Sequence, residues 1–247
     1  MFRLPHLGII SFIFCSIFSV SKSYAEDTAC PDASRSCALS VLEKTVKSIE
    51  DERWRDRALR ELAKSYASNN QAGAAIPLIA LIQNPDTKAL TIRGIGMNAA
   101  ELGLGHSVYK DLFSKLDGEA QKIEHEASQA IAYTYIGMAQ SYSGLDDDAI
   151  ETALAMDNPA LQNKALGEIA EIQAAHGKAD LAFKTLVLIK DFSFRNKAYR
   201  VVSKIFAQEK QYKHAFDASM LNENLTSRAE SLQSLLYEME KHSKGEE

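Results

Sequence analysis

Residues 164–189 read KALGEIAEIQAAHGKADLAFKTLVLI, and this stretch decides the fold. Apolar residues recur at the three- and four-residue spacing of an α-helix on both sides of a central glycine. The pattern predicts a helix that ends at Ala175, a turn at His176-Gly177 and a second helix that begins at Ala179.

The apolar faces of these two helices carry small residues at Ala170 and Ala182. Leucine at either position would bury more area, but it would hold two crossing helices further apart. The alanines therefore predict a pair of helices packed at close range.

The same arrangement returns along the chain at a spacing of 33 residues. Steps of 33 from Ala182 reach Ala215 and Ala149, a step of 41 then reaches Val108, and two more steps of 33 reach Ala75 and Leu42. Thirteen residues before these anchors an apolar residue is followed by a small one, in the pairs Leu62-Ala63, Ile95-Gly96, Ile136-Gly137, Ile169-Ala170 and Val202-Ser203, with Leu235-Leu236 one step further. Such a period predicts an all-α array in which each unit is two amphipathic helices joined by a tight turn.

The step of 41 is longer than the others and predicts a local departure from the array. Its extra residues fall in the stretch from 115 to 137. We expect a break at Asp117-Gly118 and then an unusually long helix from Glu119 to Tyr142. This helix would project as a ridge that carries Lys122, Glu124, His125 and Glu126.

The chain resembles the tetratricopeptide repeat family from Cys37 to Met239. Two units carry the resemblance: Ile169, Ala170, Gly177, Ala182, Leu186 and Ile189 in one, and Leu62, Ala63, Tyr66, Ala75, Ile79 and Ile82 in the other. The family's proline after the second helix is absent from several units, so the chain is tetratricopeptide-like. The resemblance implies a right-handed α-solenoid of about five repeats over residues 37–241 and a scaffold that binds proteins without catalysis.

The ends of the array follow from the same register. Residues 36–50 predict a lone N-terminal helix, and residues 226–241 predict a capping helix. Glu238, Glu240 and Lys241 would give the cap a polar outer face, and residues 242–247 would form a disordered tail.

The N-terminus predicts export. Arg3 is followed by an apolar segment from Leu7 to Val20, and Ser23-Tyr24-Ala25 suits cleavage after Ala25. We therefore expect residues 1–25 to be a signal peptide, the alternative being a retained anchor, and the mature protein to be soluble and periplasmic or secreted. An oxidising compartment favours a local disulfide between Cys30 and Cys37. This disulfide would close the N-terminal segment 26–36, because Cys37 is the residue directly after it.

The charge and the motifs exclude several functions. Removal of Arg3 and Lys22 would leave 26 basic against 33 acidic residues, which argues against a nucleic-acid partner. No hydrolase, zinc-protease or phosphate-loop motif is present, so we expect neither an enzyme nor a cofactor. Glu124-His125-Glu126 point apart on a helix and Asp146-Asp147-Asp148 lack the rest of a calcium loop, so we expect no metal.

The family's inner curve indicates where a partner would bind. Its lining positions lie five residues before, two before and two after the large apolar residue of each first helix. The partner-binding groove expected here comprises Arg57, Arg60, Lys64, Arg93, Met97, Met138, Lys197, Arg200 and Lys204; Leu90, Ile131, Thr134, Lys164, Gly167 and Glu171 fill the remaining positions. Cations would lie at both ends of an apolar centre, unless these are ordinary solvated helix faces.

Three functions fit these observations. The first is a periplasmic adaptor that binds a protein or peptide, such as a component of an envelope, motility or secretion machine. The second is a protein that binds peptidoglycan or polysaccharide, or an accessory subunit of an enzyme, with Trp54 and tyrosines as stacking groups. The third is a self-assembling array. Trp54 is either packed under the cap of its helix or exposed as an anchor for a partner.

Overall fold

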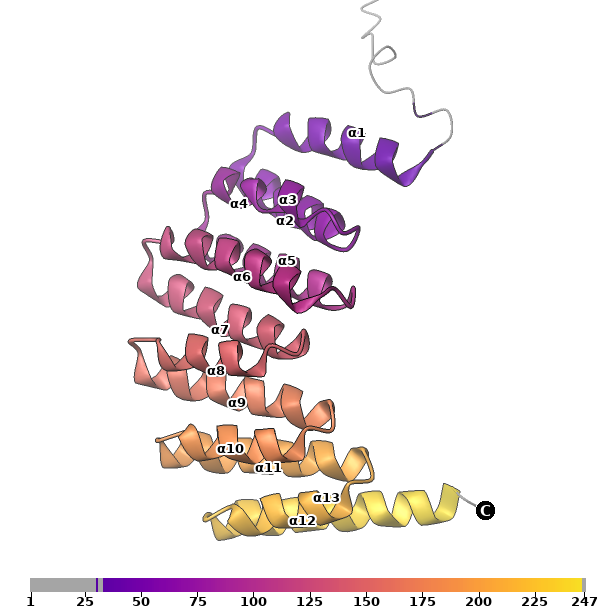
Figure 1. Cartoon of the computed structure of the whole chain (residues 1–247), viewed down its shortest axis with the longest axis vertical. Coiled ribbons are helices and arrows are strands. Elements are labelled where there is room, and N and C mark those ends of the chain that lie inside the picture. Colours follow the sequence, from indigo (N-terminus) through magenta and orange to yellow (C-terminus); the bar gives the residue numbers. More distant parts are fainter. Residues whose placement is uncertain (1–29, 31–32, 246–247) are drawn as a thin grey trace, which may run out of the picture.

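The computed structural model describes Cys30 and residues 33–245, and the predicted signal peptide lies outside them. Within this range the chain is all-α, without strands. Figure 1 shows the helices stacked in one column, with α1 at one end and α13 at the other.

The column is built from long helices, all but the last of which are followed by one or two helices of equal or shorter length, and α1 precedes the first. The long helices are α2 (Glu52–Ala67), α5 (Pro85–Ala100), α7 (Glu126–Tyr142), α9 (Pro159–Ala175), α11 (Phe192–Gln208) and α13 (Leu225–Gly245). The others are α1 (Arg35–Lys47), α3 (Ala72–Ala75), α4 (Pro77–Leu81), α6 (His106–Gln121), α8 (Asp146–Leu154), α10 (Ala179–Leu188) and α12 (Tyr212–Leu221). The predicted turn between Ala175 and Ala179 is confirmed to the residue.

The long helices form a continuous row. α5 packs between α2 and α7, α9 packs between α7 and α11, and α13 packs against α11. Each of α6, α8, α10 and α12 packs against the long helix before it. The row therefore has neighbours on both flanks and a covering helix on one side, which leaves its other side open.

Capping side chains mark where several helices begin, and residues with left-handed backbone conformation mark where they end. Asn84, Asn158 and Asp191 accept hydrogen bonds from the first backbone N–H groups of α5, α9 and α11, as N-cap residues do. Each of these helices, like α2 and α7, is followed within three residues by a left-handed residue: Asn70, Gly103, Gly144, Gly177 and Lys210. Tight turns at these points return the chain antiparallel to itself.

Small residues at the crossings explain the close packing. A Cβ added at Gly96 would lie 2.9 Å from the Cβ of Ala139 on the neighbouring long helix. At Gly137 it would lie 3.3 Å from the Cδ1 of Ile169 and 3.4 Å from the carbonyl oxygen of Ala149. Ala170 and Ala182, the small residues from which close packing was predicted, are both fully buried.

The long step in the repeat is accommodated differently from the prediction. Asp117 and Gly118 lie inside α6, and the break comes at residues 122–125. No long helix from Glu119 to Tyr142 forms, so the predicted ridge was wrong. α6 has 16 residues where α8 has 9, so most of the added length extends α6 instead. Val108 is also not a packing anchor, since it is 52% exposed.

The C-terminal cap is less polar than predicted. Glu238 is buried, whereas Leu236 and Tyr237 are 58% and 64% exposed. α13 continues to Gly245, past the predicted end of the array at residue 241.

At the other end, the sulfur atoms of Cys30 and Cys37 lie at disulfide distance, with their Cα atoms 5.7 Å apart. Among the described helices, none combines the length and the apolar character needed to cross a membrane.

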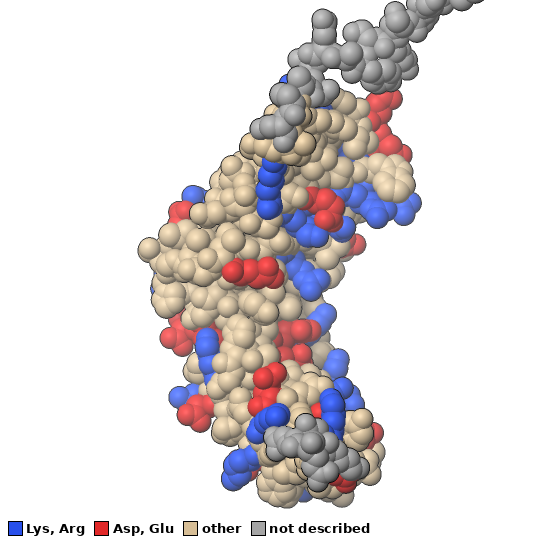
Figure 2. Space-filling model, turned by 90° about the vertical axis from the view of Figure 1, so that its right-hand side faces the viewer, with Lys and Arg blue, Asp and Glu red and all other residues tan. Residues whose placement is uncertain are grey.

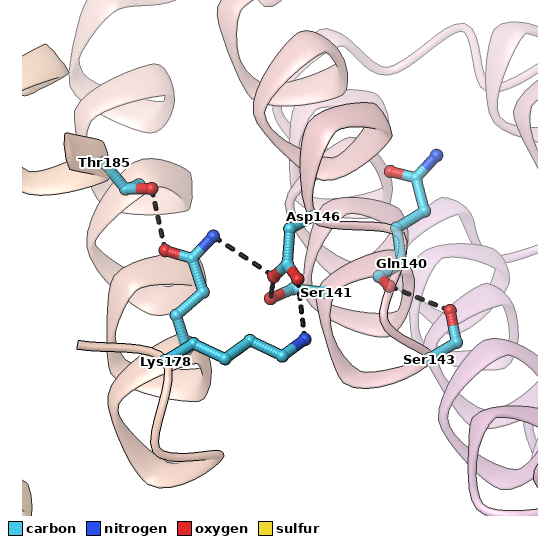
Figure 3. A network of polar contacts seen from close by, with 7 residues as sticks. Gln140, Ser141, Ser143, Asp146, Lys178 and Thr185 are labelled. Carbon is cyan, nitrogen blue, oxygen red and sulfur yellow. Dashed lines mark hydrogen bonds and ion pairs between the residues drawn. The ribbon is translucent and has the colours of Figure 1, made fainter. Parts of the chain in front are cut away.

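The apolar core consists of two clusters that meet between α7 and α9. One contains buried residues from Leu39 to Leu145 and the other contains buried residues from Ala149 to Leu235. Asp146 lies at this boundary and accepts hydrogen bonds from Ser141 Oγ at 2.9 Å and Gln173 Nε2 at 3.2 Å. Figure 3 shows this network, in which Lys178 approaches the second carboxylate oxygen. We call it the Asp146 network.

A second set of polar contacts ties the long helices to the loops beside them. The carboxylate of Asp56 accepts hydrogen bonds from the backbone N–H groups of Gln83 and Asn84. Asn163 and Asn196 use Oδ1 in the same way, for the N–H groups of Lys190 and Glu223. All three lie six residues before the buried apolar residue of their repeat. They fix the loops that lead into the next long helices.

Candidate functional site

The open side of α2, α5, α7, α9 and α11 is the candidate site, and we call it the row face. Figure 2 shows the molecule curved around a hollow flank, along which Lys and Arg side chains gather with Asp and Glu among them. The predicted groove positions are on the helices of this row. Away from the ends of these helices, the exposed residue of α5 is Arg93, and the exposed residues of α11 are Lys197, Arg200 and Lys204. These are the positions that the repeat assigns to the groove.

The N-terminal end of the row face carries an exposed aromatic ring. Trp54 is 59% exposed, so of the two alternatives for this residue the structure favours exposure over packing under the helix cap. The guanidinium carbon of Arg57 lies 4.9 Å from the centre of the indole ring, a cation–π arrangement. Trp54 and Arg57 therefore present a flat apolar surface and a cation together.

The next two cations share one carboxylate. Arg60 Nη2 lies 2.9 Å and Lys64 Nζ lies 2.8 Å from the carboxylate oxygens of Glu61. The alkyl stem of Lys64 also lies over Gly94, where an added Cβ would come within 2.5 Å of Lys64 Cγ. The alkyl stem of Lys64 thus packs against α5, and the carboxylate of Glu61 partly neutralises its ammonium group.

The centre of the row face is shallow and partly apolar. Met97 is partly buried against the core and Met138 is half-buried. Arg93 lies over the ring of Tyr135, with its guanidinium carbon 5.1 Å from the ring centre. Thr134 and Gly167 are buried, so these two projected positions form the floor and offer no side chain to a partner.

A carboxyl with an unusual proton affinity follows on α9. Burial, and to a smaller extent the neighbouring charge of Glu168, raise the pKa of Glu171 to about 7, although the charge of Lys197 on α11 acts in the opposite direction. Glu171 can therefore change its charge near neutral pH.

The C-terminal end of the row face is hollowed. Lys197 and Arg200 line a pocket of about 600 Å³ with Asn196, Thr226 and Glu230. Arg200 Nη1 lies 3.5 Å from Glu230 Oε2, an exposed pair that stabilises little. Lys204 is exposed one turn further along α11 and makes no ion pair within the described part of the chain. This end can accept a carboxylate.

The other polar residues singled out from the sequence have structural roles. His125 precedes α7, and its Nδ1 lies 2.7 Å from Ser128 Oγ. The ring of His176 packs edge-on against Tyr142, with ring centres 4.8 Å apart. Among the described residues, no three His, Cys, Asp or Glu side chains are arranged to hold a metal ion.

On the row face most of the predicted cations form one group on α2 and another on α11, and Arg93 lies on α5 between them. Arg57, Arg60 and Lys64 form one group, and Lys197, Arg200 and Lys204 form the other. Tyr135 was missed by the sequence analysis. Tyr133 and Tyr135 both flank the projected position Thr134, so adjacency in the sequence does not distinguish them.

Comparisons with protein-family models, curated proteins and solved structures found no match for this chain. The functional argument therefore rests on the geometry of the row face.

Proposed function

We propose that this protein is an exported, periplasmic scaffold that binds an extended segment of a partner protein along the row face, without catalysing a reaction. In this proposal the helix pairs are about five tetratricopeptide-like repeats of a right-handed α-solenoid. The observation that carries it is the arrangement of the open side: two groups of cations separated by a half-buried centre that contains Met97 and Met138.

The chemistry of the two ends suggests the kind of segment that would bind. Carboxylates of the partner would pair with Arg57 at one end and with Lys197 and Arg200 at the other, while apolar side chains would contact the methionines. Methionine side chains adapt to different shapes, which suits a contact surface. The exposed ion pairs would mainly steer association and set its direction, and the central contacts would supply affinity.

The proposal is tested by charge reversal on the row face. Proteins captured from periplasmic extract by the wild type would be identified, and binding of the purified partner would be measured by calorimetry at low and high salt. We expect the double variant Arg57→Glu/Arg200→Glu to lose the partner and wild-type affinity to fall with salt.

A matched control carries Lys115→Glu and Lys213→Glu, which change the net charge equally on the exposed sides of α6 and α12. The control should bind like the wild type. Unchanged binding by the row-face variant, or equal loss in the control, would contradict the proposal.

A second function is favoured by one specific observation, the 59% exposure of Trp54 on the same face as Tyr135. Exposed aromatic rings can stack on sugars, as in a protein that binds peptidoglycan or polysaccharide. Retention on insoluble peptidoglycan, lost in Trp54→Ala but kept in a variant of the exposed Tyr237 on α13, would support this function over the adaptor. Equal retention by all variants would count against it.

A further inference from the structure

A pocket lies away from the predicted groove positions. It has a volume of about 860 Å³ and shares no lining residue with the predicted groove. Its walls come from the C-terminal turns of α6, the start of α7, the end of α8 and the turn that leads into α9. Pockets of this size hold small molecules.

The lengthening of α6 builds one wall of this pocket. Asp117 lines the pocket from the part of α6 that extends beyond the length of α8, which ends after 9 residues. α8 is too short to fill the space beside it. The irregular step in the repeat thus has a structural product, since it supplies one wall of this pocket.

The lining is acidic without a compensating cation. Four carboxylates line the pocket, each from a different element: Asp117 on α6, Glu126 on α7, Glu151 on α8 and Asp157 in the turn before α9. No Lys or Arg lines it. Among the described residues, none of the four makes an ion pair, and Asp117 accepts one hydrogen bond, from Gln121 Nε2 at 2.6 Å.

The rest of the lining is mixed. It contains Leu161, Met156, three alanines and the ring of Tyr133, along with the polar side chains of Gln121, Gln129, Thr152 and Asn158. Burial raises the pKa of the Tyr133 hydroxyl and the charge of Asp117 raises it further, so the phenol stays neutral at physiological pH. A neutral aromatic ring beside carboxylates suits an organic cation, which it can contact through its π face.

We propose that this pocket binds a linear polyamine. Its ammonium groups would pair with carboxylates contributed by separate helices, and the methylene segments between them would lie on Leu161, the alanines and Tyr133. A single metal ion would leave most of this volume and the apolar lining unused. A linear chain with several separated positive charges matches both the spread of the carboxylates and the apolar surface between them.

The test is calorimetric titration of the full mature chain with spermidine and with putrescine. We expect one spermidine per chain, weaker binding of the shorter diamine, and affinity that falls with salt. The double variant Glu151→Gln/Asp157→Asn should weaken spermidine binding at least about tenfold, which corresponds to about 1.4 kcal/mol. Both residues are exposed, so folding should be retained, and circular dichroism would check this.

A charge-matched control, Asp180→Asn/Glu209→Gln, alters two exposed carboxylates that do not line the pocket, and it should bind like the wild type. Absence of binding by the wild type would overturn the proposal, as would equal weakening in the two double variants. A lysine-rich peptide that binds more tightly than spermidine and depends on Glu151 and Asp157 would also overturn it, since the pocket would then receive a protein segment. The row-face variants should bind spermidine normally, so this proposal and the proposed function can fail separately.

Discussion

Lys178 Nζ lies 2.6 Å from Asp146 Oδ2, and this ion pair joins the turn after α9 to the start of α8. The side chain of Asp146 is only 8% exposed, and its other oxygen accepts hydrogen bonds from Ser141 and Gln173. One carboxylate therefore links α7, α8 and α9 with the turn before α10, at the boundary between the two apolar clusters. The role of Asp146 therefore extends beyond the favourable charge of an acidic residue in the first turn of a helix.

Replacing Asp146 by alanine should destabilise the protein. Lys178, Gln173 and Ser141 would lose their shared partner in a buried site, for an expected loss of about 3 kcal/mol in the free energy of unfolding. Asp147→Ala, at the exposed next position of the same helix start, should cost less than about 1 kcal/mol. Urea unfolding followed by circular dichroism measures both, and equal losses would show that the network does not stabilise the fold.

Replacing either of two helical glycines by alanine should change the stability of the protein, but in opposite directions. Gly96→Ala would place its Cβ 2.9 Å from that of Ala139 and push α5 away from α7, at a cost of about 1–3 kcal/mol. Gly118→Ala meets no atom within 4 Å and should stabilise α6 by about 0.5–1 kcal/mol through helix propensity. The midpoints of thermal unfolding of the two variants, each compared with the wild type, test whether α5 needs a glycine at residue 96 to pack against α7. Similar shifts in both variants would contradict it.

The hydrogen bonds between Asp56 and the loop before α5 predict a loss of stability when Asp56 is replaced. This residue is 2% exposed, and Asp56→Ala would leave the backbone N–H groups of Gln83 and Asn84 without their acceptor. We expect a loss of about 2–3 kcal/mol in unfolding free energy and faster amide hydrogen exchange at both residues. Asp111→Ala removes an exposed carboxylate paired with Lys115, and should change stability by less than about 0.5 kcal/mol. Unchanged amide hydrogen exchange at Gln83 in Asp56→Ala would show that Asp56 does not protect this N–H group.

Glu171 should make stability depend on pH. The pKa of its carboxyl is raised from 4.5 to about 7, so the folded state holds the proton more tightly than the unfolded chain. Its stabilising contribution is present below pH 4.5 and is lost as the pH rises towards about 7. Glu171→Gln should remove this loss, which we expect to be at most about 2 kcal/mol for a half-buried group.

Unfolding free energies of the wild type and Glu171→Gln, measured on both sides of this pH window, provide the test. The difference between them should change with pH in favour of the variant as the pH rises. Glu240→Gln, an exposed carboxylate on α13, serves as the control and should show no such change. Parallel pH profiles for the wild type and Glu171→Gln would contradict the prediction.

The helix pairs could be predicted from the sequence because their signal is periodic. Leu62, Ile95, Ile136, Ile169 and Val202 are at most 1% exposed, at the positions that the repeat assigns to the core. A buried apolar residue followed by a small one recurs only where two helices cross, so the spacing carries the packing information.

The placement of the extra residues could not be predicted from the spacing alone. A step of 41 gives the added length but not the helix that receives it. Gly118 suggested a break, yet a glycine inside a helix costs only about 1 kcal/mol. Leu116 and Ala120 on either side are fully buried, and keeping both in one helix outweighs this cost. Competition between a local preference and nearby burial decided the outcome.

The site was predictable only in part for a related reason. The row-face cations follow the register of the repeat, so projection found them. The acidic pocket combines Asp117 with Asp157, which lie 40 positions apart in the sequence, and no repeat relates them.

The division of the core into two clusters has a mechanical consequence. When the ends of the molecule are pulled apart, apolar contacts yield gradually because they have no preferred direction, whereas a hydrogen bond is lost within about 1 Å of stretching. The Asp146 network would therefore act as a stiff, brittle coupling between two more compliant arms. A partner that binds both arms at once would meet this coupling as resistance to a change in curvature, and its failure would leave the packing of α9 against α7 and α8 to hold the arms together.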